Sequence, residues 1–171
     1  MSRLPNALKK LTAAAHKIAV CETSAGGKIA ASLLAQPGAS KFFAGGVVAY
    51  SKTAKHVYLG LDPDASKPTS TEPHAVELAM AARSRLGTEW AIGETGVAGP
   101  QANSRGIAPG VCAIAVVGPQ GLVNSRMLYP DDKLSASDAY GQAPKVPREE
   151  AMQRFSSAAL SLLVETVLDK E

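Results

Sequence analysis

The chain has 171 residues, of which 46% are apolar, 19% charged and only 5% aromatic. This length predicts a single compact domain whose core needs no disulfide or metal ion, and the apolar fraction argues against disorder. A net charge of +3 is too balanced to indicate a nucleic-acid partner, and no apolar run approaches the ~18 residues of a membrane span.

The first half of the chain alternates helical and strand-like segments. Leu4, Leu8 and Leu11 share one face of the first helix, and Pro37-Gly38 ends the second. The expected elements are a helix from about Pro5, a strand at Lys17–Cys21, a helix at Lys28–Gln36, a strand at Gly45–Tyr50, and a helix capped by Ser51 and ended by Gly60. Because four basic residues precede the first acidic residue, Glu22, an amphipathic targeting segment is an alternative to the first helix.

The second half ends its alternation with a hairpin, whose turn is Gly118-Pro119-Gln120-Gly121. The expected elements are a loop at Asp62–Thr71, a helix at Pro73–Leu86, a strand at Glu89–Thr95, a loop at Gly96–Gly110, strands at Val111–Val117 and Leu122–Tyr129, a polar, mobile loop at Pro130–Pro147 and a helix at Arg148–Asp169. This order predicts one α/β domain over residues 1–171, with three α/β/α layers and a mixed, mostly parallel sheet.

Both cysteines, Cys21 and Cys112, lie in apolar, strand-like runs without zinc or redox spacing. We therefore expect buried, reduced thiols and a cytoplasmic protein. The three histidines also lack metal-ligand spacing, so we interpret them as surface or helix residues rather than ligands; they are His16, His56 and His74.

Three loops whose residues could bind a ligand or catalyse a reaction follow the three expected parallel strands. They are Glu22–Gly27, Tyr50–Lys55 and Thr95–Pro100. Ligands of α/β sheets bind beyond the carboxyl ends of the strands, so this convergence predicts a small-molecule site.

In the first loop, backbone N–H groups at a helix start could hold an anion or a developing oxyanion. Thr23 and Ser24 place hydroxyls there, either as nucleophiles or only as helix caps. No phosphate-loop or dinucleotide motif opens this helix, which speaks against those ligands.

In the second loop, Lys55 lies one turn into a helix, where partial burial would lower its pKa and suit it to act as a base. Tyr50 could pass a proton or orient the nucleophile. A solvated lysine and a core-edge tyrosine are the alternative. The third loop is glycine-rich, which allows close backbone approach to a ligand or simply a tight turn. Arg105 and Arg148 are candidate phosphate ligands or solvated side chains.

Together these motifs resemble the C-terminal domain of the competence-damage protein CinA. The residues concerned are Glu22-Thr23-Ser24-Ala25-Gly26-Gly27, the run Gly45-Gly46-Val47-Val48-Ala49-Tyr50-Ser51 with Ala54-Lys55, and Thr95-Gly96-Val97-Ala98-Gly99-Pro100, within a match from about Leu8 to Val117. The family includes stand-alone nicotinamide-nucleotide amidases. The resemblance therefore implies an amidohydrolase that converts nicotinamide mononucleotide into nicotinate mononucleotide and ammonia, without a metal or other cofactor, as a homodimer.

The resemblance also implies residue roles. The family's first motif usually reads Glu-Ser-Cys-Thr-Gly-Gly with a nucleophilic serine, whose position here is Thr23. Lys55 is the implied base and Tyr50 its helper, and the N–H groups of residues 25–27 would stabilise the oxyanion. The implied substrate-binding residues are Glu22, Ser24, Ala25, Gly26, Gly27, Gly46, Ser51, Lys52, Thr95, Gly96, Ala98, Gly99 and Arg148, with Lys52 or Arg148 on the phosphate.

Several departures from the family pattern leave alternatives open. Threonine can attack a carbonyl, but its γ-methyl group crowds the tetrahedral intermediate. Lys52 replaces an asparagine, and the insertion Asp131–Pro147 has no counterpart in the compact bacterial enzymes. A non-catalytic binding or assembly protein is therefore a second hypothesis, and a hydrolase for another amide or ester, with Ser24 as nucleophile, is a third.

Overall fold

The computed structural model describes residues 3–131, 140 and 146–169. Its strands are β1 (Ile18–Glu22), β2 (Phe43–Val48), β3 (Trp90–Gly96), β4 (Cys112–Val117) and β5 (Val123–Leu128). Its α-helices are α1 (Leu4–Ala13), α2 (Lys28–Leu34), α3 (Ala39–Phe42), α4 (Lys52–Ala54), α5 (Glu72–Leu86) and α6 (Arg148–Leu168). A π-helical turn, η1 (Lys55–Leu59), continues α4, and a 3-10 turn, η2 (Pro119–Gly121), joins β4 to β5.

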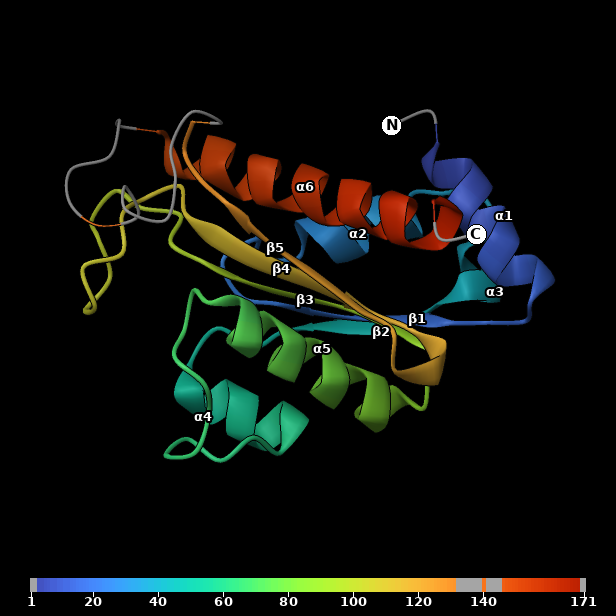
Figure 1. The fold of residues 1–171 in the computed structure, drawn as a ribbon, viewed down its shortest axis with the longest axis horizontal. Coiled ribbons are helices and arrows are strands. Elements are labelled where there is room, and N and C mark those ends of the chain that lie inside the picture. The colour runs from blue at the N-terminus through green and yellow to red at the C-terminus, as the bar shows by residue number, and fades with distance from the viewer. Residues whose placement is uncertain (1–2, 132–139, 141–145, 170–171) are drawn as a thin grey trace.

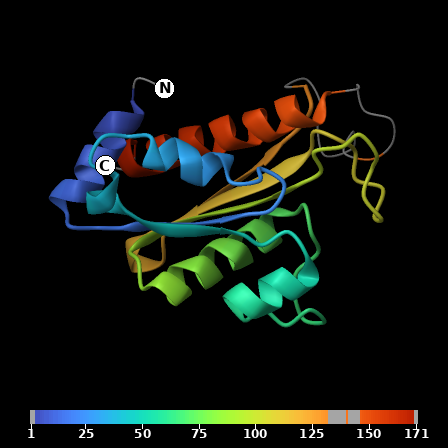
Figure 2. The same cartoon turned by 180° about the vertical axis from the view of Figure 1, so that it is seen from behind.

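The sheet separates two layers of helices (Figure 1). Helices α1, α2, α3 and α6 cover one face, and α4 and α5 cover the other, as the view from behind also shows (Figure 2). The strand order among the described residues is β2-β1-β3-β4-β5. β1 pairs in parallel with β2 and β3, whereas β4 is antiparallel to both β3 and β5, so four of these five strands run in one direction. The predicted three-layer α/β/α fold with a mixed sheet is confirmed.

Side chains of β1 alternate between the two faces of the sheet. Ile18 and Val20 belong to the core that α1, α2 and α6 cover, and Ala19 and Cys21 belong to the smaller core against α5. Cys21 and Cys112 are both buried free thiols, as predicted. This alternation fixes which face the residues at the end of β1 occupy.

Helices α1 and α6 pack together beside the sheet. Leu4, Leu8 and Leu11 of α1 are buried as predicted, and an Arg3–Asp169 ion pair joins the start of α1 to the end of α6. The α6 stripe buries Phe155, Ala159, Leu162 and Leu163. Among the described residues, no helix has both the length and the apolar character required to cross a membrane.

Two local features differ from the sequence predictions, and a third prediction is not tested. Residues 39–42 form helix α3 after Gly38, whose φ of +80° turns the chain, so the second strand starts at Phe43 and ends at Val48. The helix that Ser51 caps becomes π-helical at Lys55 before Gly60 ends it. Of the predicted mobile loop Asp131–Pro147, residues 132–139 and 141–145 lie outside the described residues.

At Gly93, α5 lies very close to the sheet. A Cβ atom there would lie 2.0 Å from the carbonyl oxygen of Ala75 and 2.7 Å from the backbone nitrogen of Ala79. No rotamer change relieves a clash with helix backbone, so we expect Gly93→Ala to lower the unfolding free energy by about 3 kcal/mol in urea denaturation. Gly87→Ala is the control, because it has open space and pays only the cost of a positive φ, about 1 kcal/mol. Equal losses in the two variants would contradict this close approach.

Candidate functional site

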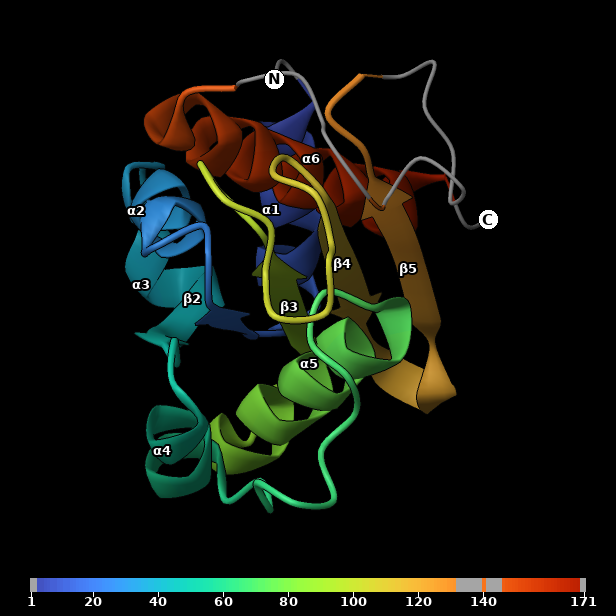
Figure 3. The same ribbon diagram turned by 90° about the vertical axis from the view of Figure 1, so that its left-hand side faces the viewer.

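The three loops meet at the carboxyl ends of β1, β2 and β3, as the end-on view shows (Figure 3). Arg148, at the start of α6, joins two of them. Its guanidinium donates to the carbonyl oxygen of Gly99 and lies 3.5 Å from the hydroxyl of Tyr50. The predicted convergence of the loops at one edge of the sheet is therefore present.

Glu22, the last residue of β1, caps helix α2 with its buried side chain. Its carboxylate accepts hydrogen bonds from the backbone N–H groups of Gly27, Ile29 and Ala30, at 2.9, 3.1 and 2.8 Å. Burial raises the pKa of Glu22, against the opposing effect of these N–H groups. The start of α2 is thus already occupied by a protein carboxylate.

A second buried carboxylate, Glu94 of β3, organises the rest of the first loop. It is fully buried and accepts from the backbone N–H groups of Thr23 and Ala25, both at 2.9 Å. The Ser24 hydroxyl and the Cys112 thiol also donate to it. Glu94 was not among the predicted site residues, although an acidic residue that directly follows the apolar run Trp90-Ala91-Ile92-Gly93 within one strand is itself a signal of a buried carboxylate.

These two carboxylates correct two predictions about the first loop. The N–H groups of Ala25 and Gly27, expected to stabilise an oxyanion, are bonded to Glu94 and Glu22 instead. Thr23 and Ser24 do not cap α2, because Glu22 does so. Within the described residues, the backbone N–H groups of this loop without a recorded partner are those of Ser24 and Gly26.

The hydroxyls of Thr23 and Ser24 have different surroundings. Thr23 Oγ1 donates to the backbone carbonyl oxygen of Glu94 at 3.2 Å. Thr23 directly follows β1, and extending the alternation of that strand by one residue assigns it to the face of Cys21, toward α5. Ser24 is buried against the Glu94 side chain, in contact range of Gly96. Burial raises the pKa of the neighbouring Cys21 thiol to about 12, so this thiol stays protonated at neutral pH.

Lys55 is buried, with only 7% of its surface exposed. The solvated-lysine alternative is therefore wrong. Its Nζ atom lies 3.2 Å from Nε2 of His74, which is itself buried in α5 rather than exposed. Burial is the leading cause that lowers the pKa of Lys55, and the nearby Lys52 adds to it. The described residues contain no hydrogen bond between Lys55 and Thr23 or Tyr50.

The remaining residues of the second loop lie at the surface. Ser51 caps α4, its hydroxyl accepting from the N–H of Ala54 at 3.0 Å, as predicted. Tyr50 is 63% exposed and faces Arg148, so it is neither a core-edge residue nor a hydrogen-bond partner of Lys55. Lys52 is exposed beside the pocket described below.

Several other predicted binding residues have structural roles. Thr95 Oγ1 accepts from the N–H of Ser70 at 3.1 Å, and Ala98 is buried in the core. A Cβ at Gly96 would lie 2.9 Å from Ser24 Oγ, so only glycine fits there. Gly26 and Gly27 have positive φ at the turn into α2, and Gly46 lies inside β2, packed on Val20 and Ala30, away from the loops.

A pocket of about 290 Å³ opens beside Lys55 and His74. Three further cations line it, Lys52, Lys67 and Arg105, and none of the described residues that line it is a carboxylate. Arg105 is held in place by a 2.7 Å hydrogen bond to the carbonyl oxygen of Thr69. Such a pocket suits an anionic small molecule. Among the described residues, no group of three or more His, Cys, Asp or Glu is arranged to hold a metal ion.

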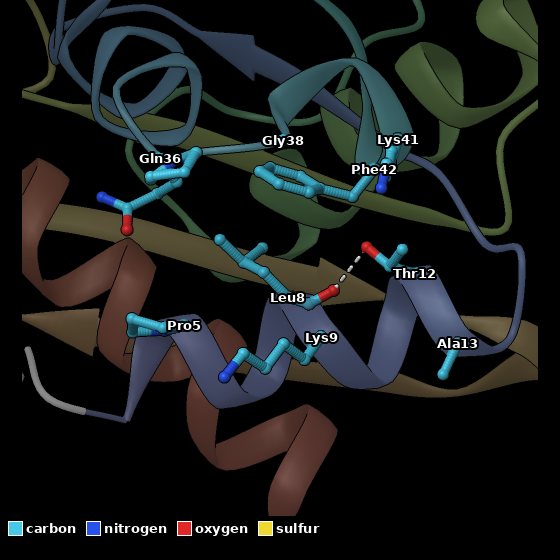
Figure 4. A pocket seen from close by; sticks show the side chains of 10 residues that line it. Pro5, Leu8, Lys9, Thr12, Ala13, Gln36, Gly38, Lys41 and Phe42 are labelled. Carbon is cyan, nitrogen blue, oxygen red and sulfur yellow. Dashed lines mark hydrogen bonds between the residues drawn. The ribbon is translucent and has the colours of Figure 1, made fainter.

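A larger pocket, of about 550 Å³, lies at the other end of the strands between α1 and α3 (Figure 4). Leu8 and Phe42 form its apolar wall, and Lys9 and Lys41 also line it. The described residues that line it include no carboxylate, no histidine and no part of a motif loop, so they offer no acid–base pair. Chemistry rather than size therefore marks the smaller pocket as the candidate site.

Comparison with known proteins bears on this site. The sequence pattern of the CinA C-terminal domain matches residues 3–167. A CinA-like protein of Prochlorococcus marinus (strain MIT 9313) is 42% identical over 106 residues, which are 61% of this chain and 25% of that protein. A CinA-like protein of Synechocystis sp. is 35% identical over 118 residues, or 68% of this chain and 28% of that protein. The chain spans about a quarter of the length of these curated relatives.

Solved structures share the fold. The competence damage-inducible protein A (ComA) of Klebsiella pneumoniae subsp. pneumoniae superposes with a TM-score of 0.81 and 21% identity, covering 99% of this chain and 98% of that one. The competence/damage inducible protein CihA of Agrobacterium tumefaciens has a TM-score of 0.79 and 23% identity, covering 96% and 93%. At these identities the likeness shows the fold alone.

Proposed function

The chain belongs to the CinA C-terminal domain family, and on that premise we propose that it is an amidohydrolase that converts nicotinamide mononucleotide into nicotinate mononucleotide and ammonia. One observation carries the proposal. A buried lysine with a lowered pKa, Lys55, lies in the wall of a pocket that three further cationic side chains line. An amine that loses its proton more readily than an exposed lysine is suited to act as the base toward a hydroxyl nucleophile in amide hydrolysis.

In the proposed reaction, Thr23 Oγ1 attacks the carboxamide carbon while Lys55 Nζ takes the hydroxyl proton. A carbon–oxygen bond forms, and the carbonyl oxygen becomes an oxyanion. The N–H of Ser24, which has no recorded partner within the described residues, is the donor best placed for it, in place of the occupied N–H groups of Ala25 and Gly27. The carbon–nitrogen bond then breaks, Lys55 returns the proton to the departing ammonia, and water hydrolyses the threonine ester.

The phosphate of the substrate is proposed to lie in the 290 Å³ pocket. Lys52, Lys67 and Arg105 would surround it with positive charge, and Arg105 offers a bidentate fork. Arg148 does not line this pocket; its bonds to Gly99 and Tyr50 suit it to hold the loops together. A homodimer and a cytoplasmic location remain predictions from the sequence.

A non-catalytic ligand-binding protein is the second candidate. It is favoured by the hydrogen bonds of the two reactive groups. Thr23 donates to the carbonyl oxygen of Glu94 and Lys55 lies against His74, so Thr23 and Lys55 are not bonded to each other. Catalysis requires the Thr23 hydroxyl to turn from the Glu94 carbonyl toward Lys55 when substrate binds. The Ser24 hydrolase is disfavoured, because that hydroxyl is buried against Glu94.

The test is ammonia release from nicotinamide mononucleotide by the wild type and by Thr23→Ala, Ser24→Ala and Thr23→Ser. We expect Thr23→Ala to be inactive and Ser24→Ala to keep activity. Thr23→Ser is expected to be about threefold to tenfold faster, because removing the γ-methyl relieves crowding of about 0.5–1.5 kcal/mol. Calorimetric binding of the mononucleotide without ammonia release from any variant would support the binding protein and overturn the amidase.

A further inference from the structure

The buried amine of Lys55 is the first member of a chain of polar side chains. Lys55 Nζ lies 3.2 Å from His74 Nε2, and His74 Nδ1 lies 2.8 Å from Glu77 Oε2. The backbone N–H of Lys67 also donates to Glu77 Oε2, at 3.1 Å. His74 is only 1% exposed, whereas Glu77 is partly exposed. The chain therefore runs from the proposed base, through the buried His74, to the partly exposed Glu77.

The donors and acceptors of this chain are fixed by Glu77. A carboxylate only accepts hydrogen bonds, so the Nδ1 atom of His74 must carry the proton. A neutral imidazole with its proton on Nδ1 has its lone pair on Nε2, and Nε2 can then only accept from Lys55. Burial lowers the pKa of His74, mainly through desolvation, which favours this neutral ring.

We propose that His74 is a positioning residue for Lys55: held in its Nδ1–H form by Glu77, it accepts a hydrogen bond from Nζ and directs the remaining valences of the amine toward Thr23. The proposal rests on the proposed function in making Lys55 the base. When Lys55 takes the Thr23 proton, the new ammonium keeps one N–H on His74 and presents the others to the departing ammonia. A neutral acceptor at Nε2 stabilises that ammonium, whereas a protonated ring would repel it.

Within the described residues, His74 is the side chain that forms a hydrogen bond with Lys55. The charged and titratable groups that act on Lys55 are Cys21 from β1, Glu77 from α5, Lys52 from α4 and Glu94 from β3. Those that act on His74 are Glu77 and Lys55. The former groups act on Lys55 through their charge, whereas His74 Nε2 is within hydrogen-bond distance of its Nζ atom. A change at His74 should therefore reach Lys55 directly.

The test compares His74→Leu, which removes the acceptor, with His74→Gln, whose amide oxygen can replace Nε2. His16→Gln, at the opposite end of β1, is the matched control. We expect His74→Leu to lower kcat for ammonia release by about 10–100-fold with KM within twofold, and His74→Gln to recover most of kcat. The acceptor Nε2 of His74 stabilises the charged form of Lys55, so its loss in His74→Leu should also lower the titration midpoint of Lys55 by about one pH unit. NMR of lysine-labelled protein measures this midpoint.

The NMR measurements separate this inference from the proposed function. Long-range proton–nitrogen spectra of the wild type should show His74 protonated on Nδ1 alone. A ring protonated on Nε2, or a Lys55 midpoint that His74→Leu leaves unchanged, overturns the positioning role even in an active enzyme. If the wild type releases no ammonia, the proposed function fails, while an Nδ1–H ring together with the shifted midpoint still supports the Lys55–His74–Glu77 arrangement. The spectra that locate the proton on Nδ1 need only the wild-type protein, so they test the arrangement even if His74→Leu does not fold.

Discussion

The Lys55→Met variant is expected to release ammonia from nicotinamide mononucleotide about 10²–10⁴-fold more slowly than the wild type, with the loss in kcat. Methionine is close to lysine in length and fills the same buried space, but it cannot take the Thr23 proton. Steady-state kinetics of the two proteins is the measurement. The control is Lys41→Met, which replaces an exposed lysine at the other end of the strands and should leave activity unchanged. Full activity in Lys55→Met would assign the base to another residue.

The fold of Lys55→Met should survive, because two effects on stability oppose each other. Removing the amine deprives His74 of a hydrogen-bond donor, which costs about 1 kcal/mol. It also removes a buried cation. Since the folded-state pKa of Lys55 is lowered, the group contributes stability above its ordinary value of 10.5, and that contribution is lost as pH falls through the folded pKa. At neutral pH the variant is therefore expected to unfold close to the wild-type midpoint.

The same lowered pKa sets the direction of the pH dependence of catalysis. Lys55 acts as a base only when neutral, so kcat/KM should rise with pH through its folded pKa, below 10.5. Threonine has no pKa in this range, so we assign the rising limb to Lys55, and the Lys55→Met variant tests that assignment. Lys55→Met should lack this limb in whatever residual activity it retains.

The sequence was sufficient for most of the fold because its elements are strongly patterned. Leu4, Leu8 and Leu11 repeat at helical spacing, and Ser51 and Gly60 bracket a helix as cap and stop. Helix α3 was not predicted because four residues are too few for helical periodicity to register. The π-helical turn at Lys55 was also not predicted, since its bonding pattern has no signature in the sequence that the spacing of apolar residues reveals.

The loops of the site were predictable, but their internal bonds were not. Motif order placed Thr23, Lys55 and Gly99 at one edge of the sheet, because parallel strands share that edge. Which groups would occupy the N–H atoms of the first loop depended on Glu94, which is 71 residues from Thr23 and reaches the loop only through strand pairing. His74 likewise follows the apolar register of α5, and its contact with Lys55 arises from tertiary packing.

Glu94→Leu is expected to lower the free energy of unfolding by about 4 kcal/mol, because it leaves the N–H groups of Thr23 and Ala25 and the hydroxyl of Ser24 buried without partners. Glu94→Gln is the matched variant. Its amide oxygen can accept from both N–H groups and its NH₂ can donate to Ser24, so its cost should be only about 1 kcal/mol. Urea denaturation measures both.

Activity follows from the same bonds, since Glu94 holds the loop that carries Thr23. At temperatures where both variants are folded, Glu94→Gln should keep most of the ammonia release, whereas Glu94→Leu should lose it as Thr23 is released from its position. Such a difference would assign Glu94 a positioning role through the backbone of the first loop. Equal stability and equal activity of the two variants would instead show that the loop holds its shape through Glu22 and α2 alone.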